Sequence, residues 1–201
     1  NDAFSYCHSL SDVMIGNGVN SIMNGAFNCC SSLIDVKMGY GVTSIGENAF
    51  INCRSLKNIN ISDSVTFIGQ SAFCYCESLT SITIPNSVTF IGERAFGYCS
   101  SLPNVIIGDG LNSISRWAFR DCTSLDIVTI GKNVTEIGSA AFVNCSIIEV
   151  CCYATTPPSL PLYSDFEGIT NDCKLFVPAG CDSAYKSSKW GRYFSNIIEL
   201  E

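Results

Sequence analysis

The sequence predicts a right-handed repeat solenoid, with a parallel sheet on one face and short turns or helical turns on the other. An Ala-Phe pair recurs every 23 residues, from Ala3 to Ala141, without insertion or deletion. A cysteine follows with the same period, from Cys7 to Cys145. Apolar residues between these marks also recur, so each unit reads LxxVxIxxxVxxIGxxAFxxCxS. A period in the twenties indicates units that bury their apolar side only against their neighbours.

Each unit is expected to contain one strand of the sheet. In the stretch LTSITI, Leu79, Ile82 and Ile84 are predicted to face inward and Ser81 and Thr83 outward, as in a half-buried strand. Stacking the strands turns every position into a ladder of side chains. One outward column should hold Asp12, Asp35, Asn58, Ser81, Asn104 and Ile127, and the next Met14, Lys37, Asn60, Thr83, Ile106 and Thr129.

A tight turn is expected after each strand, followed by a short helical turn. The tripeptides at residues 16–18 (GNG) and 85–87 (PNS) consist of residues that favour tight bends or positive φ. After the turn, Ile91, Ala95 and Cys99 are spaced i, i+4, i+8. That spacing predicts a helical turn with one side facing the core.

The period stops at about Ala154, which predicts a boundary. We expect a solenoid over residues 1–153, with six full 23-residue repeats and partial ends, and a capping segment over residues 154–201 that closes the last coil. In the cap, CKLFVP predicts a strand, and CDSAYKSSKW predicts a short helix with Asp182 as its N-cap. The side chains expected to cover the open end of the stack are Trp190, Tyr193, Phe194, Ile197 and Ile198.

Composition and charge argue against several classes of partner. The chain has 11 Lys and Arg against 18 Asp and Glu, a net charge of −7, and no basic run. Nucleic acid and anionic membrane surfaces are therefore not expected partners. No apolar run reaches the roughly 18 residues of a membrane helix. The sequence starts in mid-repeat and has no signal-peptide pattern, so we expect any export signal to lie outside it.

The thirteen cysteines could form disulfides, bind a metal, take part in catalysis or simply pack in the core. Parallel stacking holds the Cβ atoms of the seven periodic cysteines about 4.8 Å apart, farther than the ~3.8 Å that a disulfide favours. We interpret these seven as reduced, buried side chains. The chain has no CxxC pair and one histidine, His8, so neither a metal site nor another cofactor is predicted.

The sequence also bears on four cysteines outside the periodic set. Cys151 and Cys152 lie in the last predicted strand, so their side chains should point to opposite faces. Cys173 and Cys181 flank KLFVPAG, and the sequence leaves both a disulfide and two free thiols open for this pair.

Two groups of residues are candidates for catalysis. A Cys nucleophile needs a nearby base, and His8 follows Cys7 directly, but nothing else in the sequence reinforces this arrangement. Asp12 and Asp35 should stack one rung apart, but carboxylates on an open sheet lack the burial that would tune one of them as an acid. A solvated face is the preferred interpretation of the aspartates.

The unit LTSITIPNSVTFIGERAFGYCSS resembles the 23-residue leucine-rich repeat of the BspA-like surface proteins of anaerobic bacteria and some parasitic protists. The resemblance extends from Asn1 to about Tyr153, and LFVPAG, AYK and NIIEL in the tail are similar to the closing segment of bacterial members. It implies a right-handed leucine-rich-repeat array and a secreted or surface-anchored protein used in adhesion. No catalytic residues come with the family.

The function expected from the sequence is a non-catalytic, extracellular or cell-surface-anchored module for protein binding or adhesion. Its partner would be a protein or glycan on a host or neighbouring cell. The alternatives are a structural spacer in a longer surface protein and an enzyme that uses Cys7 and His8. The expected ligand-binding residues form a polar, nearly uncharged field on the sheet: Lys37, Asn58, Asn60, Ser81, Thr83 and Asn104.

Overall fold

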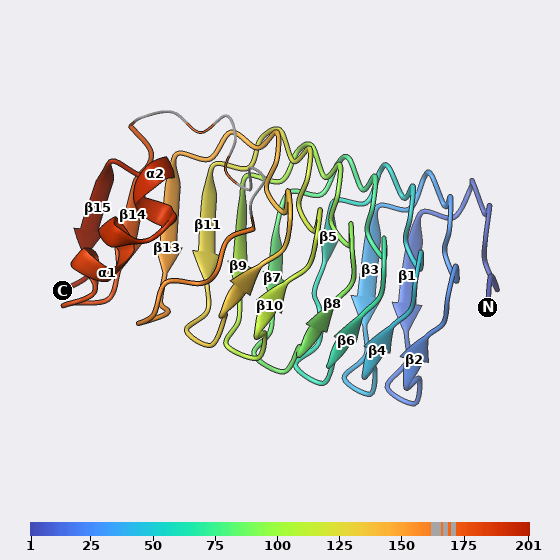
Figure 1. Cartoon of the computed structure of the whole chain (residues 1–201). Helices are drawn as coiled ribbons and strands as arrows, with labels where there is room; N and C mark the ends of the chain where they lie inside the picture. Colours follow the sequence, from blue (N-terminus) through green and yellow to red (C-terminus); the bar gives the residue numbers. More distant parts are fainter. Residues whose placement is uncertain (162–165, 167–168, 170–171) are drawn as a thin grey trace.

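The computed structural model is a stack of coils that runs from the N-terminus to a small helical region at the C-terminus (Figure 1). It describes residues 1–161, 166, 169 and 172–201. Each coil of the stack has three sides: a longer strand, a two-residue strand, and a turn segment that leads to the next coil. We call these the long-strand face, the short-strand face and the turn edge.

The long-strand face consists of parallel strands in register at the repeat period. Asp12 lies beside Asp35, and Ile127 beside Asn104, so each outward column is continuous from rung to rung. The ladder hydrogen bonds divide the face into two sheets, with the break between β5 and β7. The strands are β1 (Asp12–Ile15), β3 (Asp35–Met38) and β5 (Asn58–Ile59) in one sheet, and β7 (Ile82–Ile84), β9 (Asn104–Ile107), β11 (Ile127–Ile130), β13 (Glu149–Cys152), β14 (Lys174–Val177) and β15 (Asn196–Glu199) in the other.

The short-strand face is the second set of parallel strands, and it also has a break. A glycine follows these strands in most coils because the chain there touches the coil before it: a Cβ on Gly92 would lie 2.3 Å from the backbone nitrogen of Gln70. Ser115 occupies that place one coil later, and its hydroxyl donates to the Ile91 carbonyl. The face divides at this point into β2 (Ser21–Ile22), β4 (Ser44–Ile45), β6 (Phe67–Ile68) and β8 (Phe90–Ile91), and then β10 (Ser113–Ile114) and β12 (Glu136–Ile137).

The turn edge is not helical, and the prediction of a helical turn was wrong. Its amides alternate between their own turn and the next coil: the N–H of Ala95 donates to Gly92 O, whereas the N–H of Phe96 donates to Ala118 O. Two residues per coil adopt positive φ, which redirects the chain before a helix can form. The two columns are Asp2, Gly25, Asn48, Ser71, Arg94, Trp117 and Ala140, and Tyr6, Cys29, Asn52, Tyr75, Tyr98, Asp121 and Asn144.

The core lies between the three sides and consists of the predicted ladders. Leu79, Ile84, Ile91 and Phe96 are all at most 1% exposed, which confirms the predicted register. The phenylalanine rings of successive coils, from Phe27 to Phe142, stack nearly parallel. The centroids of neighbouring rings lie 5.1 to 5.5 Å apart. Offset stacks of this kind add to the free energy gained from burying the rings.

The C-terminal part continues the stack in a different form. Phe166 extends the phenylalanine ladder by one ring, 24 residues after Phe142, and contacts Trp190 at 5.3 Å. Trp190 and Phe194 are buried, as predicted. Residues 162–165, 167–168 and 170–171 of the predicted cap lie outside the described residues. The boundary at residue 154 stays a prediction, because β14 and β15 continue the sheet of the repeats.

The predicted N-cap of the cap helix is wrong by one residue. Helix α1 (Asp182–Ser187) begins at Asp182 itself, and Cys181 is its N-cap without a side-chain hydrogen bond. The carboxylate of Glu199 in β15 accepts the N–H of Asp182 at 3.1 Å and so takes the capping role. The Asp182 side chain pairs instead with Lys186, one helical turn later. A second helix, α2 (Trp190–Tyr193), follows.

Candidate binding surfaces

The predicted ligand-binding field lies on the long-strand face, with every side chain exposed. Asn58 stands beside Asp35 in register, and Thr83 beside Ile106. Because the backbone groups of the strands pair with neighbouring strands, side chains carry the chemistry that this face presents to a partner. The field spans β3, β5, β7 and β9 and therefore includes the break between the two sheets; its members are Lys37, Asn58, Asn60, Ser81, Thr83 and Asn104.

Apolar side chains flank the polar field at both ends. Met14 is 79% exposed on β1, and Ile106 and Ile127 are 47% and 38% exposed on β9 and β11. The sequence predicted these outward positions. Farther along, the column of Met14 and Ile106 continues through Cys151 and Phe176, whereas the column of Ile127 continues through Glu149 and Lys174. Exposed apolar side chains therefore lie among polar and charged ones toward both ends of the face.

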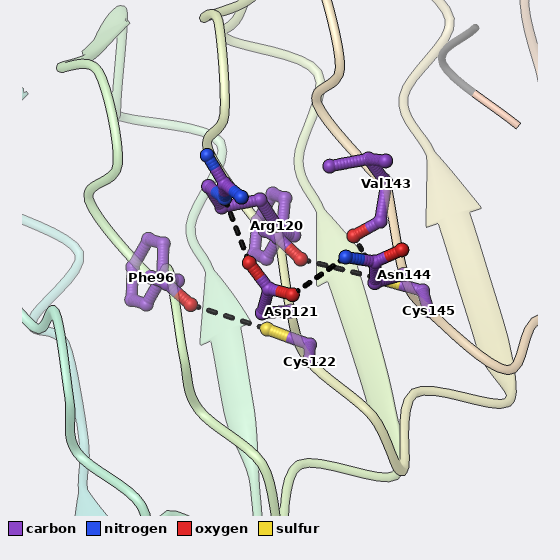
Figure 2. Close-up of polar contacts among 8 residues, drawn as sticks. Phe96, Arg120, Asp121, Cys122, Val143, Asn144 and Cys145 are labelled. Carbon is purple, nitrogen blue, oxygen red and sulfur yellow. Dashed lines mark hydrogen bonds and ion pairs between the residues drawn. The ribbon is translucent and has the colours of Figure 1, made fainter. Parts of the chain in front are cut away.

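A ladder of thiols lies behind the turn edge (Figure 2). Each buried periodic cysteine donates its S–H to the carbonyl of a phenylalanine 26 residues earlier; Cys122 reaches Phe96 O at 3.2 Å. The same contact recurs from Cys30 to Cys145, at 3.0 to 3.4 Å. Cys7, at the end of the stack, is exposed, so the prediction of burial holds for the other six.

Burial changes the acidity of these thiols. It raises the pKa of Cys53 to about 12, and it raises that of Cys76 well above the ordinary value. A protonated thiol is a poor nucleophile, which makes the ladder chemically inert at neutral pH. Cys173 and Cys181, left open by the sequence, are free thiols, and Cys151 and Cys152 point to opposite faces as expected.

A polar network covers the thiol ladder on the turn edge (Figure 2). Asp121 accepts hydrogen bonds from Arg120 Nε at 2.7 Å and from Asn144 Nδ2 at 2.8 Å. Burial alone would raise the pKa of Asp121, but these two hydrogen bonds, the positive charge of Arg120 and a hydrogen bond from Tyr98 together outweigh it, so the pKa is lowered. Tyr98 and Tyr75 continue the same column as a stacked pair, with ring centroids 4.4 Å apart.

The residues weighed for catalysis do not assemble into one site. Cys7 and His8 are both exposed, and the ring Nδ1 of His8 lies 3.3 Å from Ser31 Oγ in the next coil. Asp12 and Asp35 stack one rung apart as predicted. Among the described residues, no three His, Cys, Asp or Glu side chains come together as metal ligands. No helix in the same part of the chain has the length and apolar character needed to span a membrane.

Two surface features were missed by the sequence analysis. The first is a pair of exposed aromatic rings on the short-strand face: Phe67 and Phe90 stack at 5.0 Å and are 38% and 46% exposed. Both precede a buried isoleucine, at positions occupied by Ser21 and Ser44 in earlier coils. That change from serine to phenylalanine within the repeat was the available signal.

The second is an aromatic and basic cluster beside the break in the short-strand face. The guanidinium carbons of Arg116 and Arg94 lie 3.4 and 4.3 Å from the ring centroid of Trp117. Arg120 lies 5.7 Å from the same ring and 5.6 Å from the ring of Tyr98. Three of the five arginines of this acidic chain therefore gather at one place, which we call the Trp117 cluster.

Comparisons with known proteins agree with the repeat architecture. A family model described as the BspA type leucine-rich repeat region matches residues 1–80 and 43–156, in 6 copies. A comparison with curated proteins finds no match.

Two solved structures share the fold. The leucine-rich repeat protein of T. pallidum is 30% identical, with a TM-score of 0.65 over 72% of this chain and 67% of that one. A leucine-rich repeat protein from Bacteroides ovatus is 21% identical, with a TM-score of 0.63 over 98% of this chain and 63% of that one. The present chain thus spans about two thirds of the length of each structure.

Proposed function

The chain belongs to the BspA-type leucine-rich repeat family, and we propose that it is a non-catalytic, extracellular module for binding or adhesion. Its partner would be a protein or a glycan on a host or neighbouring cell. The long-strand face would make the contact, through Lys37, Asn58, Asn60, Ser81, Thr83 and Asn104.

One observation carries this proposal: the exposed columns differ from rung to rung while the buried ladders stay the same. The inward neighbours of the field, such as Ile59 and Ile84, are buried isoleucines. The outward positions of the same strands are Asn58 and Thr83, with Lys37 one coil earlier. A rigid scaffold with an individual surface is suited to recognition, because the paired backbone holds the side chains in place before a partner arrives.

The thirteen free cysteines are compatible with an extracellular position. Oxidising surroundings favour disulfides between reactive thiols, but the thiolate is the reactive form. Burial keeps ladder members such as Cys53 and Cys76 protonated, and their S–H groups already donate to phenylalanine carbonyls. The resemblance to surface proteins supports the same location.

A structural spacer is the second candidate. A spacer needs only a soluble outer surface and has no use for large exposed apolar side chains. Met14 and Ile106, at 79% and 47% exposure beside the polar field, favour the binding module over the spacer.

The proposal is tested by a binding screen of the folded chain against immobilised extracellular-matrix proteins and glycans. We expect saturable binding to at least one of them, and no binding by the same protein after heat denaturation. Affinity would be modest for a single copy and higher for a multivalent display of the chain. Absence of binding from both the single and the multivalent forms would favour the spacer.

A further inference from the structure

We propose that the Trp117 cluster is a second binding site, separate from the long-strand face, which takes an acidic, extended peptide segment of a protein partner. The site would consist of the guanidinium groups of Arg94 and Arg116, held against the indole of Trp117.

The first argument is that these guanidinium groups are held in place but lack an anionic partner. Arg120 forms an ion pair with Asp121 at 2.7 Å. No ion pair involves Arg94 or Arg116 within the described ranges, although the exposed carboxylate of Glu93 precedes Arg94 directly in the chain. Stacking on an aromatic ring immobilises a guanidinium while its N–H edge stays open for a carboxylate.

The second argument is conformational. Arg94 and Trp117 occupy equivalent positions in successive coils, with φ of 56° and 59°. Gly25 and Asn48 hold this position in earlier coils, and they are the residue types that tolerate positive φ most readily. Large side chains therefore occupy a strained position where small ones would serve the fold, and such strain is concentrated at functional sites.

The third argument is the location of the cluster at the break in the short-strand face. Ser115 directly precedes Arg116 and replaces the glycine that lets the neighbouring coils pair at this position. The ladder between β8 and β10 is interrupted there, in the part of the chain that the structure describes. The departure from the repeat therefore lies next to Arg116 in the chain, and Arg94 reaches the same indole from the preceding coil.

An extended peptide suits the spacing of the two arginines. Both guanidinium carbons lie within 4.3 Å of one ring centroid, so the distance between them is at most about 8 Å. An extended peptide projects alternate side chains to the same side, about 6.6 to 6.8 Å apart. Two carboxylates at alternate positions can therefore reach both guanidinium groups, the mode by which arginine clusters recognise acidic motifs.

The test is isothermal titration of the whole chain with an acetylated and amidated peptide of alternating serine and glutamate. We expect binding that weakens as salt is raised, together with a change in tryptophan fluorescence. Trp190 is fully buried in the cap, so Trp117 is the indole that would report contact. The same peptide with glutamine in place of glutamate should bind at least tenfold more weakly.

Variants distinguish this site from unspecific charge attraction. Arg94→Gln with Arg116→Gln should weaken peptide binding at least tenfold. Arg54→Gln with Lys57→Gln removes the same charge elsewhere and should have little effect. Trp117→Asn tests the indole without relying on a strained backbone, because Asn48 already occupies the equivalent position. It should also weaken binding, with an unchanged melting temperature.

Three results would overturn the proposal. The first is no binding of the glutamate peptide at millimolar concentration, and the second is equal binding by the Arg94→Gln, Arg116→Gln double variant. The third is binding of an acidic oligosaccharide, such as an oligogalacturonate, without binding of the peptide. None of these results bears on the long-strand face, whose field lies on other strands.

Discussion

The phenylalanine carbonyl is the residue-scale feature that links one coil to the next. Phe73 O accepts the N–H of Cys76 in its own coil and the S–H of Cys99 in the following coil. The cysteine is therefore both a small core side chain and a donor across the stack. Serine could donate in the same way but would be harder to desolvate, and alanine would leave no donor. This explains why cysteine, among small residues, suits this position.

Alkaline pH should destabilise the protein through its buried thiols, both those of the ladder and Cys74. Burial raises the pKa of Cys53 to about 12 and that of Cys74 to about 11, whereas an unfolded thiol titrates near 9. Above pH 9 the unfolded state therefore binds fewer protons than the folded state, and stability falls as pH rises toward the folded pKa values. Each such cysteine contributes a slope of about −1.4 kcal/mol per pH unit.

The measurement is the free energy of unfolding by urea between pH 8 and 11. Cys53→Ala with Cys76→Ala should make the slope shallower. Cys7→Ala, at an exposed position, should leave the slope unchanged. Equal slopes for all three proteins would show that the buried thiols do not control alkaline stability.

Thiol labelling should separate the cysteines by exposure. At pH 8 and without reductant, a small alkylating reagent should modify Cys7 first and the half-buried Cys29, Cys151 and Cys181 more slowly. The buried cysteines should react only in denaturant, where mass spectrometry should count all thirteen. A periodic cysteine that stays unlabelled in the denatured protein until reductant is added would mean that the ladder is cross-linked.

At the scale of the element, close contact between coils depends on glycine. A Cβ on Gly92 would lie 2.3 to 2.6 Å from backbone atoms of Gln70 and Gly69. Gly92→Ala should therefore destabilise the protein by about 1–3 kcal/mol, because the rigid backbone of the preceding coil must move.

Gly97→Ala is the matched control for this prediction. A Cβ on Gly97 would have its nearest neighbour, the carbonyl oxygen of Arg94, at 3.5 Å, an ordinary contact. The control should change the urea midpoint little. Similar losses of stability for Gly92→Ala and Gly97→Ala would contradict the claim of close packing between coils.

The elements differ in how far sequence could predict them. The strands were predictable, because the buried Ile82 and Ile84 alternate with the exposed Thr83, as in a half-buried strand. The turn edge was not: Ile91, Ala95 and Cys99 have helical spacing, but the chain turns through positive φ at Arg94 and Tyr98. The spacing of apolar residues in the sequence predicts which side chains face the core. It does not predict that the N–H of Phe96 donates a hydrogen bond to the carbonyl of Ala118 in the next coil, since that partner lies 22 residues away.

At the scale of the whole molecule, the cap holds the last coils in place. Trp190 is fully buried, and its indole N–H donates to Pro158 O at 2.7 Å. Trp190→Ala should cost about 3–5 kcal/mol. In a stack of nearest-neighbour contacts the damage should stay local, so amide exchange should accelerate in β13 and β14 and change little in β1 and β3.

Hydrogen exchange followed by mass spectrometry measures this gradient. Tyr153→Ala, at a 47% exposed aromatic position, is the control and should leave exchange unchanged. Uniform acceleration from one end of the chain to the other would show that the molecule unfolds as a single cooperative unit.

The predicted binding field and the Trp117 cluster differ in whether their position on the surface could be predicted from the sequence. The field could be placed because period and alternation assign Asn58 and Thr83 to outward columns. The cluster could not, since the contact of Arg94 with Trp117 joins different coils through a segment predicted to be helical. Its one visible sign was Ser115, at a position where the repeats directly before and after it carry glycine.

Binding through the long-strand face is tested most directly by moving charge onto it. The measurement is the dissociation constant, for the matrix protein or glycan identified by the screen, of the Asn58→Glu, Asn60→Glu, Thr83→Glu variant. Gln70→Glu, Asn112→Glu and Ser113→Glu are exposed positions on another side of the stack and add the same charge. We expect the first variant to lose at least tenfold in affinity and the second to bind as the unmodified chain does, with all three proteins equally stable to heat. Full affinity in the first variant, with its fold intact, would contradict the assignment of binding to this face.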